Sequence, residues 1–110
     1  MANEIPAGRP ERQPTHPGKL LHDVVVPALR ENGISVVAFA EHLGVTRQTV
    51  YAILRCERPI TPDIAGRLER ALGSSSAMWL GMQAAHDAWE ASRKPELKSI
   101  KRLSLSAPGF

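Results

Sequence analysis

Side chains suited to recognising a nucleic acid gather in one short segment of the chain. Arg47 and Gln48 are adjacent, and arginine pairs with guanine and glutamine with adenine through two hydrogen bonds each. Hydroxyl groups and further arginines suit phosphate oxygens, whereas an alanine suits the methyl group of thymine. The candidate DNA-contacting residues are Thr46, Arg47, Gln48, Thr49, Tyr51, Ala52, Arg55 and Arg58.

A local pattern of caps and apolar residues predicts how this polar set is presented. Ser35 is a good N-cap for a helix over residues 36–42, and Gly44 suits the left-handed residue that ends it. Thr46 caps the next helix, residues 47–55. We expect Ala40 at the closest crossing of the two helices, with three residues turned inward: Val45, Val50 and Ile53. This is the pattern of a helix-turn-helix unit, whose second helix enters the major groove.

The rest of the chain also reads as helical, and no segment alternates as a strand would. Pro27 falls inside the first apolar stripe, where we expect the helix to kink or end. Thr61 followed by Pro62 marks the start of another helix, which Gly73 ends. The predicted fold is all-α, with five helices over about residues 18–32, 36–42, 47–55, 62–72 and 77–94.

The two ends of the chain differ from this helical body. Four prolines fall within the first 17 residues, so we predict a disordered arm over residues 1–16. The DNA-binding domain then covers residues 17–94. Beyond it, residues 95–110 mix basic and apolar side chains, and we expect either a short strand added to a partner chain or a solvated tail.

Other classes of function find little support. Cys56 is the only cysteine, and the four histidines lie on separate segments, so we expect neither a metal site nor a cofactor. There is no glycine-rich phosphate loop and no nucleophile elbow, so we expect no enzyme. Without a secretory signal or an apolar run long enough for a membrane, the chain is expected in the cytoplasm. The net charge of +3 is compatible with a polyanionic partner.

Four ordered motifs give the chain a family resemblance over residues 15–94. They are His16-Pro17-Gly18 followed by Leu21, Leu43-Gly44-Val45-Thr46-Arg47-Gln48, Arg58-Pro59-Ile60-Thr61-Pro62-Asp63-Ile64-Ala65, and Met78-Trp79-Leu80-Gly81-Met82-Gln83 with Trp89 downstream. In these motifs the chain resembles the HigA-type antitoxins of bacterial toxin–antitoxin modules, within the phage-repressor-like helix-turn-helix group. Val36 departs from that wider group, where many members have a glutamine that contacts a phosphate.

The resemblance implies a homodimer that binds a palindromic operator of double-stranded DNA in its own promoter. It also implies a partner, a HigB-like toxin with the fold of RelE ribonucleases, which the antitoxin neutralises by binding. Dimer contacts carried over from the family fall on Trp79, Met82, Trp89, Ile100 and Leu103. Two alternatives stay open: a stand-alone repressor without a toxin, and a protein-interaction adaptor that binds no nucleic acid.

Overall fold

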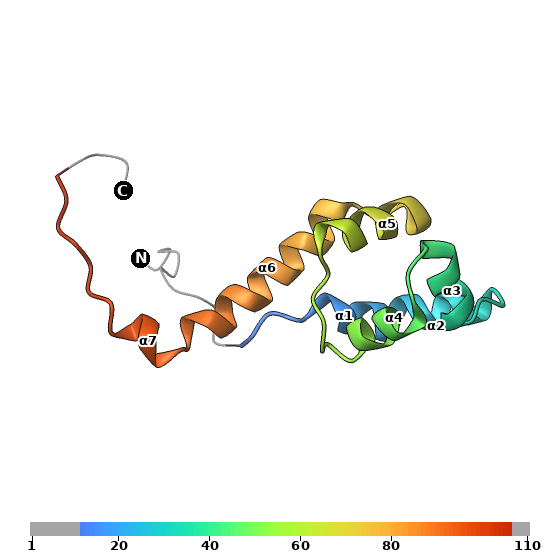
Figure 1. Cartoon of the computed structure of the whole chain (residues 1–110), viewed down its shortest axis with the longest axis horizontal. Coiled ribbons are helices and arrows are strands. Elements are labelled where there is room, and N and C mark those ends of the chain that lie inside the picture. Colours follow the sequence, from blue (N-terminus) through green and yellow to red (C-terminus); the bar gives the residue numbers. More distant parts are fainter. Residues whose placement is uncertain (1–11, 107–110) are drawn as a thin grey trace, which may run out of the picture.

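The computed structural model describes residues 12–106, and all regular structure in that range is helical. The predicted all-α fold is therefore confirmed. The elements are α1 (Pro17–Leu20), η1 (Leu21–Val25), α2 (Val26–Glu31), α3 (Val36–Leu43), α4 (Arg47–Leu54), α5 (Pro62–Leu72), α6 (Ser76–Ser92) and α7 (Pro95–Lys98). Helices α1 to α5 form a bundle, and the longer α6 leads out of it toward the C-terminal segment (Figure 1).

Pro27 does not end the first helix. The turns α1, η1 and α2 follow one another without a break, and η1 is a π-helical turn directly before the proline-containing segment. The N–H of Val26 donates to the carbonyl of Leu21, five residues back. Proline has no N–H and its ring crowds the carbonyl four residues earlier, and a widened turn accommodates both effects. Pro27 therefore widens one turn of the first helical segment and does not end it.

Local capping determines where the other helices begin and end. The side chains of Ser35, Thr46, Thr61 and Ser75 each accept a hydrogen bond from a backbone N–H in the first turn that follows. Gly44 closes α3 in the left-handed conformation with a φ of 76°. The predicted helix boundaries agree with the structure to within a few residues, and α6 ends at Ser92, before the expected end near residue 94.

The apolar core lies between α1–α2, the α3–α4 pair and the α5–α6 pair. Its buried residues are Leu21, Val26, Val36, Phe39, Ala40, Leu43, Val50, Ile53, Ile60, Ile64, Ala65, Leu68 and Trp79. Ala40 is only 1% exposed, in agreement with its predicted place at a close helix crossing. The indole N–H of Trp79 donates to the Ser74 hydroxyl over 2.7 Å, so its polar atom is satisfied although the ring is buried.

The prediction of a disordered arm is wrong for residues 13–16. The Nδ1–H of His86 on α6 donates to the Pro14 carbonyl over 2.9 Å, and its Nε2 lies 3.2 Å from the Gln13 side-chain nitrogen. These contacts hold the segment against α6, because the proline carbonyl and the glutamine amide find partners there that composition alone does not indicate. Residues 1–11 of the predicted arm lie outside the described residues.

The C-terminal segment shows no strand as far as residue 106. Pro95 instead starts the one-turn helix α7, because proline is favoured at the first helical position. Residues 101–106 carry no regular structure. In the described part of the chain, no helix is long and apolar enough to cross a membrane.

His16-Pro17-Gly18 joins the first helix to the end of α4. His16 is 7% exposed, and its Nδ1 accepts the N–H of Gly18 over 2.9 Å, which makes it the N-cap of α1. A Cβ atom placed on Gly18 would overlap the carbonyl oxygen of Ile53. The backbones of α1 and α4 therefore approach so closely that only glycine fits at this position.

Gly18→Ala tests this close approach. The added methyl group has to push α1 away from α4, and we expect the free energy of unfolding to fall by about 1–3 kcal/mol. The matched control is Gly81→Ala on α6, where a Cβ would meet nothing within 4 Å. That control should raise stability by about 0.5–1 kcal/mol, because alanine favours a helix over glycine. Urea denaturation measures both, and equal effects of the two substitutions would contradict the close approach.

The buried His16 cap should make stability depend on pH. Burial, then the charge of His86, lowers the His16 pKa below its ordinary 6.5, while Asp87 and Glu90 oppose the shift in part. Cys56, Glu57 and Arg58 border the same pocket from the loop after α4. Protonation also removes the acceptor that caps Gly18. Because the folded-state pKa is lowered, this stabilisation is complete above 6.5 and is lost as the pH falls below it.

His16→Asn isolates this contribution, because asparagine can cap the helix without titrating near neutrality. Between about pH 7.5 and about pH 5.5 the wild type should lose more unfolding free energy than the variant. Chemical denaturation at each pH gives the difference between the two proteins, in which the titration of other groups cancels. Parallel pH profiles for the two proteins would show that folding does not lower the pKa of His16.

Candidate nucleic-acid interface

Helix α4 presents the polar residues that the sequence singled out. Its inner side is anchored by Val50 and Ile53, which are 5% and 3% exposed. Arg47 and Gln48 are exposed in its first turn, and Tyr51 lies one turn further along with 39% of its surface exposed. Arg55, the C-cap, is also exposed, whereas Ala52 and Thr49 are half-buried. The predicted residues thus lie on or beside one helix, with the two best suited to base edges at its start.

The turn before α4 is short and closed by backbone hydrogen bonds. The N–H of Gly44 donates to the Glu41 carbonyl and that of Val45 to the Ala40 carbonyl, each over 3.1 Å. Gly44 adopts a positive φ, which a residue with a side chain rarely does. Val45 is half-buried against the core. The angle between α3 and α4 is therefore determined by the backbone of the turn together with the residues buried beneath it.

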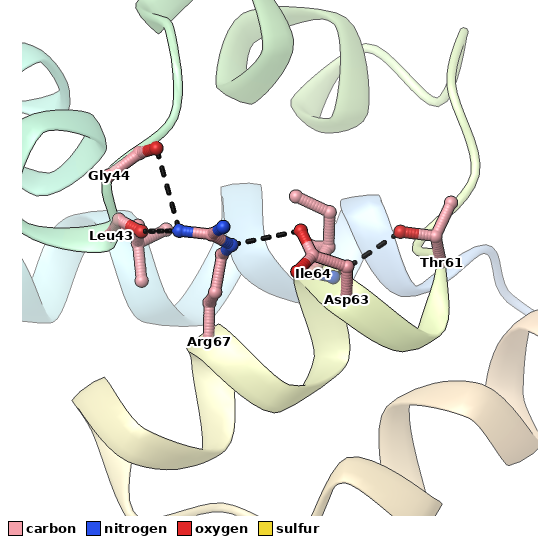
Figure 2. A network of polar contacts seen from close by, with 6 residues as sticks. All are labelled: Leu43, Gly44, Thr61, Asp63, Ile64 and Arg67. Carbon is pink, nitrogen blue, oxygen red and sulfur yellow. Dashed lines mark hydrogen bonds and ion pairs between the residues drawn. The ribbon is translucent and has the colours of Figure 1, made fainter.

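Arg67 on α5 fastens this turn to the rest of the domain. Its Nη1 donates to the carbonyl of Leu43 over 2.8 Å and lies 3.5 Å from that of Gly44 (Figure 2). Its Nε is paired with Asp63 over 2.9 Å, one helical turn earlier on α5. The last carbonyls of α3 have no partner within the helix, and the guanidinium supplies one. This role of Arg67 was not predicted from the sequence, since nothing in the local pattern links residues 24 positions apart.

A second buried contact holds the loop after α4. Gln83 on α6 is 6% exposed, and its Oε1 accepts the N–H of Ile60 over 2.8 Å. Its amide nitrogen donates to Asp87 over 3.0 Å. The role of Gln83 was not predicted either, although a polar residue on the inner side of an apolar helix is a usable signal. The loop that carries Arg58 is thereby fixed to α6.

The two predicted phosphate contacts near this loop already have partners within the protein. Arg55 pairs with Glu57 through Nε and Oε1 at 3.0 Å. Arg58 reaches back to the first turn of α4, where its Nη1 donates to the Thr49 hydroxyl over 3.0 Å. The Thr49 and Thr46 hydroxyl oxygens are 2.9 Å apart. A carboxylate therefore borders the last turn of α4, whereas uncharged hydroxyls border its first turn.

The residues expected in a dimer interface are placed in different surroundings. Trp79 is 2% exposed and belongs to the core of a single chain. Met82 and Trp89 are half-buried on α6, and the guanidinium carbon of Arg93 lies 4.6 Å from the centre of the Trp89 ring. Ile100 and Leu103 are 69% and 76% exposed. Among residues 12–106, no group of three His, Cys, Asp or Glu side chains could hold a metal ion.

Two helices joined by a tight turn, with the second exposing arginine and glutamine at its start, define a helix-turn-helix protein. The family model described as helix-turn-helix matches residues 28–80. A virulence-associated protein I of Dichelobacter nodosus is 38% identical over 104 residues, which cover 94% of each chain. Antitoxin HigA-1 of Vibrio cholerae is 34% identical over 98 residues, which cover 87% of this chain and 90% of the relative.

Solved structures agree with this assignment. Antitoxin GraA in complex with its operator is 32% identical with a TM-score of 0.73, and the match covers 89% of this chain and 99% of that one. The Pseudomonas aeruginosa antitoxin HigA with the higBA promoter is 35% identical with a TM-score of 0.67, over 83% and 99% of the two chains. The chain belongs to the HigA family of helix-turn-helix antitoxins.

Arg67→Met tests whether the contact with the turn positions α4. Methionine keeps part of the packing but leaves the α3 carbonyls without their charged donor, so we expect a loss of about 1 kcal/mol in stability. The orientation of α4 also becomes less restricted, and DNA affinity should fall severalfold. Arg70→Met is the matched control, since it removes the same charge from an exposed position on the same helix. Chemical denaturation and fluorescence anisotropy measure the two effects, and identical behaviour of both variants would contradict this role.

Proposed function

We propose that this protein is an antitoxin that represses its own operon and neutralises a HigB-like toxin of the RelE ribonuclease fold. The observation that carries the DNA-binding part is the exposed pair Arg47 and Gln48 in the first turn of α4, on a helix fixed at both ends. The solved operator complex of GraA and promoter complex of Pseudomonas aeruginosa HigA support the same target. The toxin part rests on family membership. We propose that the protein acts without catalysis, in the cytoplasm.

We propose further that the operator is palindromic and is bound by a homodimer. Two copies related by a two-fold axis would place their α4 helices about 34 Å apart, one turn of DNA. Arg47 would then pair with guanine and Gln48 with adenine in each half-site. The other proposed residues of the DNA-facing surface lie beside this pair: Thr46, Thr49, Tyr51, Ala52, Arg55 and Arg58. The outer part of α6, with Met82 and Trp89, and the exposed Ile100 and Leu103 offer apolar surface for the second copy.

Arg47→Ala separates the two activities. The variant should bind the promoter of its own gene more weakly by about 1–3 kcal/mol and discriminate less well at one base pair. It should still rescue growth when it is expressed with the toxin encoded next to it, and still capture that toxin in a pull-down. Arg70→Ala is the control for loss of one positive charge. Unchanged affinity and specificity in Arg47→Ala would refute the assigned role of Arg47.

The wild-type protein distinguishes the alternatives. Promoter binding that weakens as salt rises, together with rescue of growth, supports an antitoxin and autorepressor. Promoter binding without rescue of growth from the product of the adjacent gene supports a stand-alone repressor. Absence of DNA binding even at low salt supports a protein-interaction adaptor and overturns the proposal.

A further inference from the structure

Thr49 joins two parts of the protein that meet at the start of α4. Its hydroxyl accepts Nη1 of Arg58, which belongs to the loop after the helix, over 3.0 Å. The same hydroxyl lies 2.9 Å from that of Thr46, the N-cap, which also accepts the N–H of Thr49 over 3.1 Å. As a result, a side chain nine residues further along the sequence is held beside the first turn, next to Arg47 and Gln48.

The charge of Arg58 is not balanced by this contact. Within residues 12–106 Arg58 has no ion pair, whereas Arg55 and Arg67 are each bonded to a carboxylate. The start of a helix carries a positive partial charge, which disfavours a second positive charge nearby. A neutral hydroxyl therefore holds the guanidinium in a region that electrostatics alone would make it avoid. An anion that enters this region is therefore attracted both by the Arg58 guanidinium and by the positive partial charge at the start of α4.

We propose that Thr49 is a positioning residue, whose hydroxyl holds Arg58 where it contacts a DNA phosphate beside the base pairs read by Arg47 and Gln48. This inference rests on the proposed DNA-binding function. It changes the sequence-based expectation that Thr49 and Arg58 each contact DNA independently. The Thr49 hydroxyl is already engaged within the protein, because its oxygen accepts Nη1 of Arg58 and lies 2.9 Å from the Thr46 hydroxyl oxygen.

The physical gain is preorganisation. A free arginine side chain has about 2 kcal/mol of rotamer entropy, and ordering an exposed side chain on binding removes part of the affinity. Held by Thr49, Arg58 has already lost much of that freedom before DNA arrives. Because phosphates are common to all sequences, the benefit should apply equally to operator and unrelated DNA.

A double-mutant cycle with Thr49→Val and Arg58→Ala tests the coupling. The probes are a labelled duplex that carries the promoter region upstream of this chain's own gene and a scrambled duplex of equal length. Anisotropy titrations over a range of salt give affinity and salt slope. Thr49→Val should weaken both probes by roughly 2- to 12-fold with little change in slope, as expected for a side chain left to be ordered. Arg58→Ala should reduce the slope by about one.

The decisive measurement is the double variant. If Thr49 acts through Arg58, Thr49→Val has no further effect in the Arg58→Ala background. Additive effects would overturn the proposal and indicate that Thr49 contacts DNA itself. Thr49→Ser keeps the hydroxyl and should bind both probes with wild-type affinity. Loss of affinity in this variant too would overturn the proposal, because the methyl group and not the hydroxyl would then be responsible.

Two further observations keep the outcomes separate. Thermal denaturation checks that Thr49→Val is folded, and Thr49→Ala replaces it in the cycle if it is not. Failure of the wild-type protein to bind either probe at low salt would refute the proposed function and this inference together. If the wild type binds normally but the effects of Thr49→Val and Arg58→Ala on affinity are additive, the inference alone is refuted.

Discussion

Helix α4 is only eight residues long, and an isolated helix of that length is unstable in water. Its helical state, and with it the direction of Arg47 and Gln48, must come from contacts with the rest of the protein. Val50 and Ile53 supply buried apolar surface, but burial is not directional and does not by itself determine the orientation of so short a helix. Directional contacts at its two ends remove that freedom, and the remainder of the domain is arranged around them.

The contacts at the two ends are of different kinds. At the start, the Thr46 cap and the glycine turn are local, and Arg67 fastens the turn to α5 (Figure 2). At the end, Gly18 lets the backbone of α1 touch the last turn, and Gln83 secures the following loop to α6. Every helix except α7 thus contributes packing or a polar contact to the same unit. The helix-turn-helix therefore depends on the helices that flank it on both sides.

The features that the sequence predicted correctly are those determined by neighbours in the chain. A capping serine or threonine and a glycine in the left-handed region act over three or four residues, so Ser35, Thr46, Thr61 and Gly44 could be assigned directly. The polar contacts made by Arg67 and Gln83 span more than 20 residues and depend on how the helices meet. Pro27 was misleading for a related reason, since a widened turn compensates for it within the packed bundle.

The attachment of residues 13–16 to α6 has a consequence for the order in which the molecule opens. The bond between Pro14 and His86 joins positions 72 residues apart, while the capping bonds around α3 and α4 join positions three apart. Long-range contacts of this kind form late in folding, because loop closure opposes them until the core exists. We therefore expect residues 13–16 to open more readily than the α3–α4 pair, so that their backbone amides exchange with solvent first.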